Sequence, residues 1–225
     1  MTELIYIHIP KTGGSGVRVR LSEVYGESEQ HHIITHTPFG SDSYFIDPES
    51  VMFKDHPGFR KVIYESLRGV SEPAVLYAHL PVWVLEDVLP GVPRITVVRD
   101  PIEHIFSSVF FWKNSNPDHP KSKLPGRELA FDPMFLNTQF LYVGGIALRN
   151  FALVGITETL GDFLNEAARM FVWPEGDYDI HIGEGPRRFR EERDRLRSDK
   201  ELCDALRKRN YLDVALYDLA KSRWS

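Results

Sequence analysis

Four short runs of apolar residues mark the sequence, and within each run the apolar positions are nearly continuous rather than alternating. They are residues 4–9 (LIYIHI), 74–78 (AVLYA), 94–98 (RITVV) and 151–156 (FALVGI). A short continuous apolar run is typical of a strand that is buried on both faces of a parallel sheet. The pattern therefore predicts four buried, parallel strands.

Helical periodicity follows three of these runs. Apolar side chains recur three and four residues apart over residues 17–25, 101–110 and 160–171. Pro101 suits the first turn of the second helix, and Thr159 is placed to cap the third. Each pattern gives one apolar stripe, so each predicts a helix that packs on a core.

Two more helices are expected toward the end of the chain. Residues 198–201 (Ser-Asp-Lys-Glu) have the form of a capping box at a helix start, and residues 212–220 have a helical pattern. Strands that alternate with helices indicate an α/β fold with a mainly parallel sheet. We therefore expect one domain over residues 1–225, in three layers, with helices flanking a central sheet.

Two long stretches, residues 27–60 and 113–135, are rich in Pro, Gly, Ser, Asn and His and show neither period. Irregular segments of this length inside a compact domain are usually lids, binding loops or insertions. We expect irregular insertions at both places. They either line a binding site for an acceptor or are surface excursions.

A glycine-rich turn, IPKTGGSGV (residues 9–17), joins the first predicted strand to the helix behind it. Such a turn aims backbone N–H groups and the positive end of a helix dipole at one point, which favours binding of phosphate or sulfate. The Walker pattern GxxxxGK[ST] is absent, because the lysine precedes the glycines. The alternative is a turn that closes a βα unit without any ligand. The candidate ligand groups are those of Lys11, Thr12, Gly13, Gly14, Ser15 and Gly16.

A second junction of this kind follows the third predicted strand. Arg99 would project from the carboxyl end of that strand, where open α/β sheets bind ligands, and Ser107 lies two helical turns further on. A planar guanidinium and a hydroxyl can together hold a second phosphate. The alternative is structural, with Asp100 as the helix cap and Arg99 as an ion-pair partner.

Composition narrows the choice of partners. The chain carries 27 Lys and Arg against 32 Asp and Glu, a formal net charge of −5, which argues against a general electrostatic grip on nucleic acid or an anionic membrane. Any anionic ligand must therefore be held by a local positive patch. The single cysteine, Cys203, excludes an internal disulfide and a multi-cysteine metal site, and it fits a reducing compartment, the cytoplasm. The N-terminal apolar run is too short for a membrane span or a signal peptide, so no anchor is expected.

The two junctions together resemble those of the P-loop sulfotransferases. IYIHIPKTGGSG (residues 5–16) resembles their motif for the 5′-phosphosulfate, and ITVVRDPIEHIFSSVFFW (residues 95–112) resembles their motif for the 3′-phosphate. Residues 76–83, 153–164 and 209–224 resemble the family's catalytic-histidine segment, third strand–helix unit and closing helix. The nearest group is that of the uronyl and heparan sulfate 2-O-sulfotransferases and their bacterial relatives.

The resemblance implies a P-loop-type fold and transfer of a sulfuryl group from 3′-phosphoadenosine 5′-phosphosulfate (PAPS) to an acceptor hydroxyl, with a saccharide favoured. The product nucleotide would be 3′-phosphoadenosine 5′-phosphate (PAP). The glycine-rich turn would hold the 5′-phosphosulfate, Lys11 would neutralise the leaving phosphate, and Arg99 and Ser107 would bind the 3′-phosphate. In-line transfer of this kind depends on positioning and on charge stabilisation. The resemblance further implies no nucleic acid, no metal ion and a minimal, cytoplasmic, bacterial form of the catalytic domain.

His79 ends the second predicted strand, at the edge of the sheet where both junctions lie, and the resemblance makes it the general base for the acceptor's proton. The alternative is that His79 caps or packs against its strand. His8 alternates within the first strand and is expected in the core or behind the site. The cluster of His31, His32 and His36 has no accompanying carboxylate pattern, so no metal site is assigned.

Two departures from the family pattern bear on the acceptor. Animal relatives carry a histidine two positions before the catalytic one, where this chain has Tyr77. The Thr-Arg that follows an Asn-x-Gln element in relatives is missing after residues 137–139 (Asn-Thr-Gln). The basic segment 187–209 is either a solvated helical face with ion pairs or brings Arg187 or Arg188 onto the 3′-phosphate.

Two other functions are compatible with parts of the pattern. A nucleotide-dependent kinase or other phosphoryl transferase could use the same cradle, although the missing GK[ST] and the lack of a placed magnesium carboxylate argue against it. A non-catalytic module of the same fold could bind an anionic glycan. The presence of Lys11, Arg99, Ser107 and His79 together argues against that second alternative.

Overall fold

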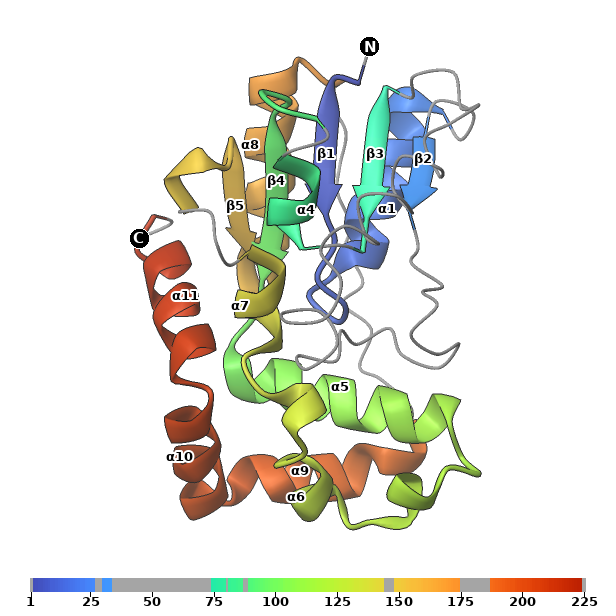
Figure 1. The fold of residues 1–225 in the computed structure, drawn as a ribbon, viewed down its shortest axis with the longest axis vertical. Coiled ribbons are helices and arrows are strands. Elements are labelled where there is room, and N and C mark those ends of the chain that lie inside the picture. Colours follow the sequence, from blue (N-terminus) through green and yellow to red (C-terminus); the bar gives the residue numbers. More distant parts are fainter. Residues whose placement is uncertain are drawn as a thin grey trace.

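The predicted strands pair into a parallel sheet with β1 at its centre (Figure 1). We describe a computed structural model over residues 2–26, 30–33, 74–79, 81–86, 89–143, 148–174 and 187–223. The strand order is β2-β3-β1-β4-β5, and every neighbouring pair is parallel. The strands are β1 (Leu4–Ile7), β2 (Gln30–Ile33), β3 (Val75–Ala78), β4 (Arg94–Val98) and β5 (Leu153–Ile156). All four predicted strands are thus confirmed.

β2 lies at one edge of the sheet, inside the stretch 27–60 for which the sequence predicts an irregular insertion. Its sequence QHHI has no apolar run, and as an edge strand it pairs with β3 alone. The Gln30 side chain is buried, and its Nε2 donates to the Ser22 hydroxyl and the Gly26 carbonyl, both at 3.1 Å. These bonds attach the edge strand to the first helix. The rest of the stretch lies outside the described residues.

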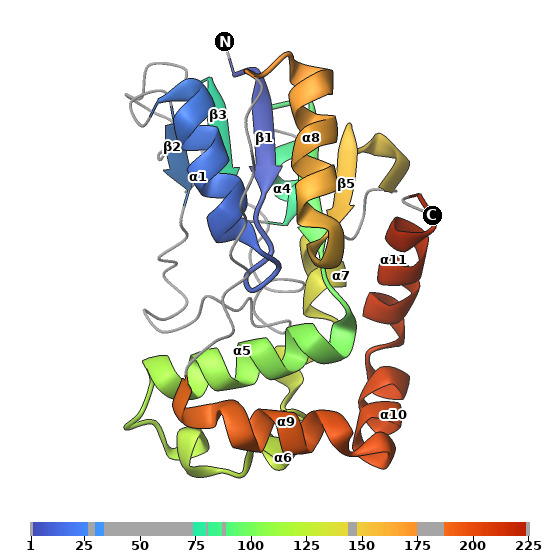
Figure 2. The same ribbon diagram turned by 180° about the vertical axis from the view of Figure 1, so that it is seen from behind.

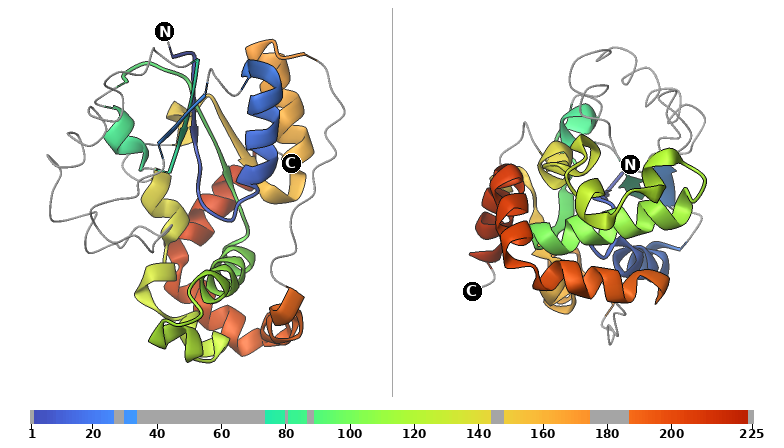
Figure 3. Two further views of the ribbon diagram at one scale, coloured as in Figure 1. Left: turned by 90° about the vertical axis from the view of Figure 1, so that its right-hand side faces the viewer. Right: turned by 90° about the horizontal axis from the view of Figure 1, so that it is seen from below.

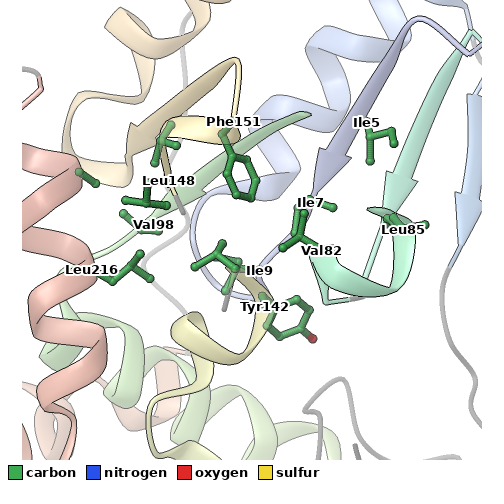
Figure 4. Packing of buried hydrophobic residues seen from close by; sticks show 14 of the residues in the cluster. Ile5, Ile7, Ile9, Val82, Leu85, Val98, Tyr142, Leu148, Phe151 and Leu216 are labelled. Atoms are coloured by element: carbon green, nitrogen blue, oxygen red, sulfur yellow. The ribbon is translucent and has the colours of Figure 1, made fainter. Parts of the chain in front are cut away.

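Helices cover both faces of the sheet, which confirms the α/β class with a parallel central sheet. Leu4 and Tyr6 point to one face, where α1 and α8 pack, and the alternate residues Ile5 and Ile7 point to the other, where α4, α7 and α11 pack (Figures 2, 3 and 4). The helices are α1 (Gly14–Tyr25), α4 (Val82–Glu86), α5 (Pro101–Ser115), α6 (Gly126–Leu129), α7 (Thr138–Val143), α8 (Leu160–Phe171), α9 (Arg190–Ser198), α10 (Lys200–Arg209) and α11 (Tyr211–Lys221).

A helical layer of α5, α6, α9 and α10 lies beyond the carboxyl ends of the strands (Figure 1). It has its own apolar core, in which Phe106 and Phe110 of α5 pack with Leu196 of α9 and Leu206 of α10. The helical layer therefore has a hydrophobic cluster of its own, separate from the clusters on the two faces of the sheet. The candidate site residues lie at this junction.

The predicted helix starts are found, but their caps differ in detail. Asp100 caps α5, because its Oδ1 accepts from the backbone N–H groups of Ile102 and Glu103 at 2.9 and 3.1 Å. Thr159 occupies the N-cap position of α8 without a side-chain cap hydrogen bond. In the expected capping box, Asp199 is the capping residue, and its side chain accepts from the N–H of Leu202 at 3.0 Å.

The second stretch expected to be irregular, residues 113–135, contains the end of α5, the short helix α6 and two 3₁₀ turns, Pro120–Lys123 and Pro133–Phe135. The Lys113 ammonium donates to the Leu124 carbonyl at 2.6 Å, so a buried cation anchors the segment. This excursion therefore covers one end of the helical layer.

Candidate functional site

The glycine-rich turn follows the central strand β1 and leads into α1 (Figure 2). Lys11 and Gly13 both have left-handed backbone conformations, with φ angles of 68° and 93°. The Gly16 N–H donates to the Gly13 carbonyl at 3.0 Å, and Ser15 is exposed in the first helical turn. The first N–H groups of a helix have no partner within the helix, so those of Gly14 and Ser15 suit an anion, whereas that of Gly16 already donates to Gly13.

Packing explains two of the glycines. A Cβ on Gly14 would lie 1.9 Å from Nε2 of His8, and a Cβ on Gly13 would lie 2.9 Å from Cδ2 of Leu160. Gly13 has a positive φ in addition, which a side chain would strain. The sequence suggests that these glycines let an anion approach the backbone closely. The structure shows a second reason for them, because the side chains of Leu160 and His8 leave no room for a Cβ.

Thr12 is fully buried and stiffens the turn from within. Its hydroxyl donates to the Ile9 carbonyl at 2.9 Å. Its own carbonyl accepts from the Thr157 hydroxyl at 2.8 Å, and that hydroxyl also lies 3.1 Å from the carbonyl of Val98. The end of β5 thus ties the turn to the end of β4.

Lys11 extends toward α5. Its ammonium lies 4.1 Å from the centre of the Phe111 ring, and its backbone carbonyl accepts from Nη1 of Arg99 at 3.1 Å. Burial lowers the pKa of the Lys11 amine, and the charge of Arg99 lowers it further. The structure therefore places the charge of Arg99 within electrostatic reach of the Lys11 ammonium.

Arg99 is fixed through both its backbone and its side chain. The Arg99 N–H donates to Oε1 of Gln139 at 2.8 Å, and Nε2 of Gln139 donates to the Arg99 carbonyl at 2.9 Å. The guanidinium lies 3.6 Å from the Glu103 carboxylate, so the ion pair of the structural alternative is also present. Burial lowers the pKa of Arg99, while Glu103 and Glu158 oppose that shift.

His104 is a contributor that the sequence analysis does not single out. It is buried in α5, and its Nε2 donates to the Pro10 carbonyl at 2.9 Å. Burial lowers the pKa of His104 to about 3, so the ring is neutral. Its hydrogen bond to Pro10 attaches α5 to the turn. The sequence does contain one sign of this role, because His104 lies among the apolar residues of the predicted helix 101–110.

Ser107 is partly buried on α5. It lies one helical turn from Glu103 and one turn from Phe111, so it shares a face with residues that contact Arg99 and Lys11. The neighbouring Ser108 is buried, and its hydroxyl has no hydrogen-bond partner among the described residues. The helical spacing therefore places Ser107 on the face of Glu103 and Phe111, and Ser108 on the face of His104, which contacts Pro10 in the turn.

His79 lies directly after β3, and the structure brings it to His8 at the end of β1. His79 Nε2 and His8 Nδ1 are 2.7 Å apart. Burial lowers the pKa of His8 well below its ordinary value, and the charges of His79 and Lys11 lower it further. His8 therefore lies within electrostatic reach of both the candidate base and the candidate phosphate-binding lysine.

The fold of this chain has a counterpart among solved structures. The chain matches the crystal structure of a sulfotransferase from Alicyclobacillus acidocaldarius with a TM-score of 0.54 and 13% sequence identity, over 98% of this chain and 96% of that one. The chain therefore has a fold similar to that of this sulfotransferase. No protein-family model matches the sequence, and no curated protein matches it significantly. The sulfotransferase fold therefore rests on the structural likeness.

Helix α9 brings further positive charge to the candidate site. Arg193 and Arg197 both lower the pKa of Arg99, so both lie within electrostatic reach of its guanidinium. Arg187 and Arg188 instead line an open cavity of about 510 Å³ with Arg190 and Glu191. The arginines that act on Arg99 are thus Arg193 and Arg197, not the predicted Arg187 or Arg188, and Arg197 also forms the ion pairs of the alternative with Glu103 and Asp194.

Within the described ranges, no group of three or more His, Cys, Asp or Glu side chains could hold a metal ion. The side chains of His31 and His32, and His36 as a whole, lie outside those ranges. In the same part of the chain, no helix has the length and apolar character needed to cross a membrane.

Proposed function

We propose that the protein transfers a sulfuryl group from PAPS to the hydroxyl of an acceptor. The observation that carries this proposal is that the Arg99 guanidinium reaches the glycine-rich turn, where its Nη1 donates to the Lys11 backbone carbonyl at 3.1 Å. The resemblance of both motifs and the likeness of the fold support the same reaction. PAPS carries a 5′-phosphosulfate and a separate 3′-phosphate, so it needs two anion sites. The glycine-rich turn and Arg99 are the candidates for these two sites.

In the proposed reaction, the acceptor oxygen forms a bond to sulfur while the bond from sulfur to the 5′-phosphate oxygen breaks. The acceptor's proton passes to His79, and PAP leaves with an additional negative charge on its 5′-phosphate. Backbone N–H groups of the turn at Gly13 and Gly14, with the exposed Ser15, would hold the phosphosulfate. The Gly16 N–H and the Thr12 hydroxyl, which the sequence also suggests as donors, already donate to the carbonyls of Gly13 and Ile9. Catalysis by this arrangement is mainly positioning and charge stabilisation.

Lys11 would neutralise the charge that develops on the leaving phosphate. Its burial and its contact with Phe111 remove water from around the ammonium, and a cation with little surrounding water interacts more strongly with a developing anion. Arg99 and Ser107 would hold the 3′-phosphate. Gln139 and His104 keep Arg99 and the turn in position by the bonds described above.

The acceptor is proposed to be a saccharide hydroxyl, which rests on the resemblance alone. The proposed cytoplasmic location rests on the single cysteine, Cys203, which is buried and unpaired in any disulfide. A kinase remains the second candidate. It is disfavoured because the turn lacks the GK[ST] of a Walker loop, with Lys11 before the glycines instead of after them.

Calorimetric titration with PAP and with ATP separates these candidates. We expect PAP to bind more tightly than ATP, and we expect Arg99→Met to weaken PAP binding roughly ten- to a hundredfold, because charged hydrogen bonds to a phosphate are lost. Arg149→Met, at an exposed position in the 3₁₀ turn Leu148–Asn150, is the matched control. Tight ATP binding without any response to PAP would show that the donor assignment is wrong.

A further inference from the structure

Two histidines from different strands meet at the carboxyl end of the sheet. β1 and β3 pair in the register Ile7 with Ala78, so His8 and His79 are the next residues on each strand. The His8 N–H donates to the Ala78 carbonyl at 2.8 Å, which continues the ladder. The two imidazole rings lie 4.2 Å apart, centre to centre, at 82°.

One nitrogen of His8 receives two contacts. Nδ1 of His8 lies 2.7 Å from Nε2 of His79 and 2.8 Å from the hydroxyl oxygen of Tyr77. Burial raises the pKa of the Tyr77 hydroxyl, so Tyr77 keeps its proton, and burial lowers the pKa of His8, so that ring is neutral. A neutral imidazole has one nitrogen with a proton and one that can only accept.

We propose that His8 is a positioning residue for His79: its unprotonated Nδ1 accepts a hydrogen bond from Nε2–H of His79. This leaves Nδ1 of His79 as the nitrogen that takes a proton. That atom is buried in the structure, so an acceptor must displace what covers it. The inference rests on the proposed function in one respect, namely that His79 is the general base.

Proton balance favours this assignment. When the acceptor oxygen bonds to sulfur, its proton moves to Nδ1 of His79, and the resulting imidazolium carries N–H groups on both nitrogens. Its Nε2–H then still has an acceptor in His8 Nδ1. With the opposite tautomers, the same transfer would set two N–H groups against each other at 2.7 Å. The geometry therefore suits a base in which His8 receives the second N–H.

The ring of His8 is held firmly enough to act in this way. Its Nε2 edge abuts Gly14, where a Cβ would come within 1.9 Å, and its face lies 5.7 Å from the ring of Tyr6 at an interplanar angle of 28°. The neighbouring charged groups are Lys11 in the turn and Arg18 on α1, which acts on Tyr77. The same ring thus touches both the donor-binding turn and the base.

Long-range ¹H–¹⁵N correlation spectra of ¹⁵N-histidine-labelled protein test the assignment without any substrate. We expect His79 as the Nε2–H tautomer and His8 with an unprotonated Nδ1. In His8→Leu, which offers no acceptor, His79 should lose its single tautomer, and its pKa measured by pH titration should fall by about one pH unit. His8→Asn, whose side-chain oxygen takes the place of Nδ1, should restore the wild-type tautomer.

His119→Gln provides the matched control, because His119 is an exposed histidine on the helical layer that accepts from the N–H of Lys121. An Nδ1–H tautomer of His79 in the wild-type protein would overturn the inference. So would an unchanged tautomer and pKa in His8→Leu. If that variant does not fold, the wild-type and His8→Asn spectra decide the question. A failure to bind PAP would overturn the proposed function and leave the spectra unaffected, so the two failures are distinguishable.

Discussion

Gly14 is a glycine because the ring of His8 occupies the space that a side chain would need. This contact joins the start of α1 to the end of β1, and it places a neutral imidazole against the turn that is proposed to hold the donor. A single small residue therefore serves the helix start and the position of His8 at the same time.

Replacement of Gly14 by Ala should destabilise the protein. The added Cβ would overlap His8 Nε2 at 1.9 Å, and overpacking of this kind costs about 1–3 kcal/mol. Gly161→Ala in α8 is the matched control, because a Cβ there meets nothing within 4 Å and alanine favours a helix interior by roughly 0.5–1 kcal/mol. Urea unfolding curves measure both changes.

The double variant His8→Ala with Gly14→Ala isolates the contact. The smaller residue at position 8 makes room for the new Cβ, so the two changes should cost less together than the sum of their separate costs. Strictly additive costs would contradict the steric explanation.

At the scale of elements, α7 and α11 cap each other. The Asp213 carboxylate at the start of α11 accepts from the N–H groups of Gln139 and Phe140 at 3.3 and 2.7 Å. In return, Oδ1 of Asn137 accepts from the N–H groups of Leu212 and Asp213 at 3.1 and 3.3 Å. Gln139 of α7 also hydrogen-bonds the backbone of Arg99, the candidate residue for binding the 3′-phosphate. The reciprocal cap therefore fixes the helix that positions Arg99.

Asp213 makes stability depend on pH. Burial raises the pKa of this carboxyl to about 7, although its backbone hydrogen bonds oppose the shift. A carboxyl whose pKa is raised in the folded state stabilises the protein in its protonated form. This contribution to the free energy of unfolding is fully present below about pH 4 and is lost as the pH rises through about 7. We expect Asp213→Asn to flatten the change in unfolding free energy across this window.

Urea titrations at about pH 5 and about pH 8 measure this difference. Asp218→Asn, an exposed position on α11, is the control and should behave as the wild type does. If the wild type and Asp213→Asn lose the same stability between the two pH values, Asp213 does not titrate in this range.

The sequence predicts the elements that are buried on both sides and misses those whose stability comes from a single neighbour. β1, β3, β4 and β5 are apolar because helices cover both their faces, whereas β2 is polar and gains its order from β3 and from the buried Gln30. The glycine-rich turn can be predicted from the sequence because its residues are consecutive. The contacts of His104 with Pro10, and of His8 with His79, depend on pairing between distant segments, which no local pattern encodes.

At the scale of the whole molecule, positive charge is concentrated while the total is negative. The formal net charge is −5, yet Lys11, Arg99, Arg193 and Arg197 gather near the junction of the sheet and the helical layer. Local charge of this kind attracts an anion even when the protein as a whole repels it.

Binding of PAP should therefore weaken as salt rises. We expect the Kd to increase about tenfold between roughly 50 and 500 mM salt, because ions screen charges that are partly exposed. Adenosine, which lacks phosphates, is the control ligand and should show little change. Calorimetry at several salt concentrations gives both dependences, and a PAP affinity that does not respond to salt would contradict a mainly electrostatic site.

The central place of β1 also has a consequence for the order of assembly. Its two partners, β3 and β4, begin at Val75 and Arg94, so the middle strand cannot be flanked on both sides until about 90 further residues have been synthesised. At roughly 5–20 residues per second, this is a wait of about 5–18 s on the ribosome. During that time β1, whose residues are all fully buried in the folded protein, is without its neighbours. The turn that carries Lys11 is therefore among the first parts to be translated and among the last to take its final shape.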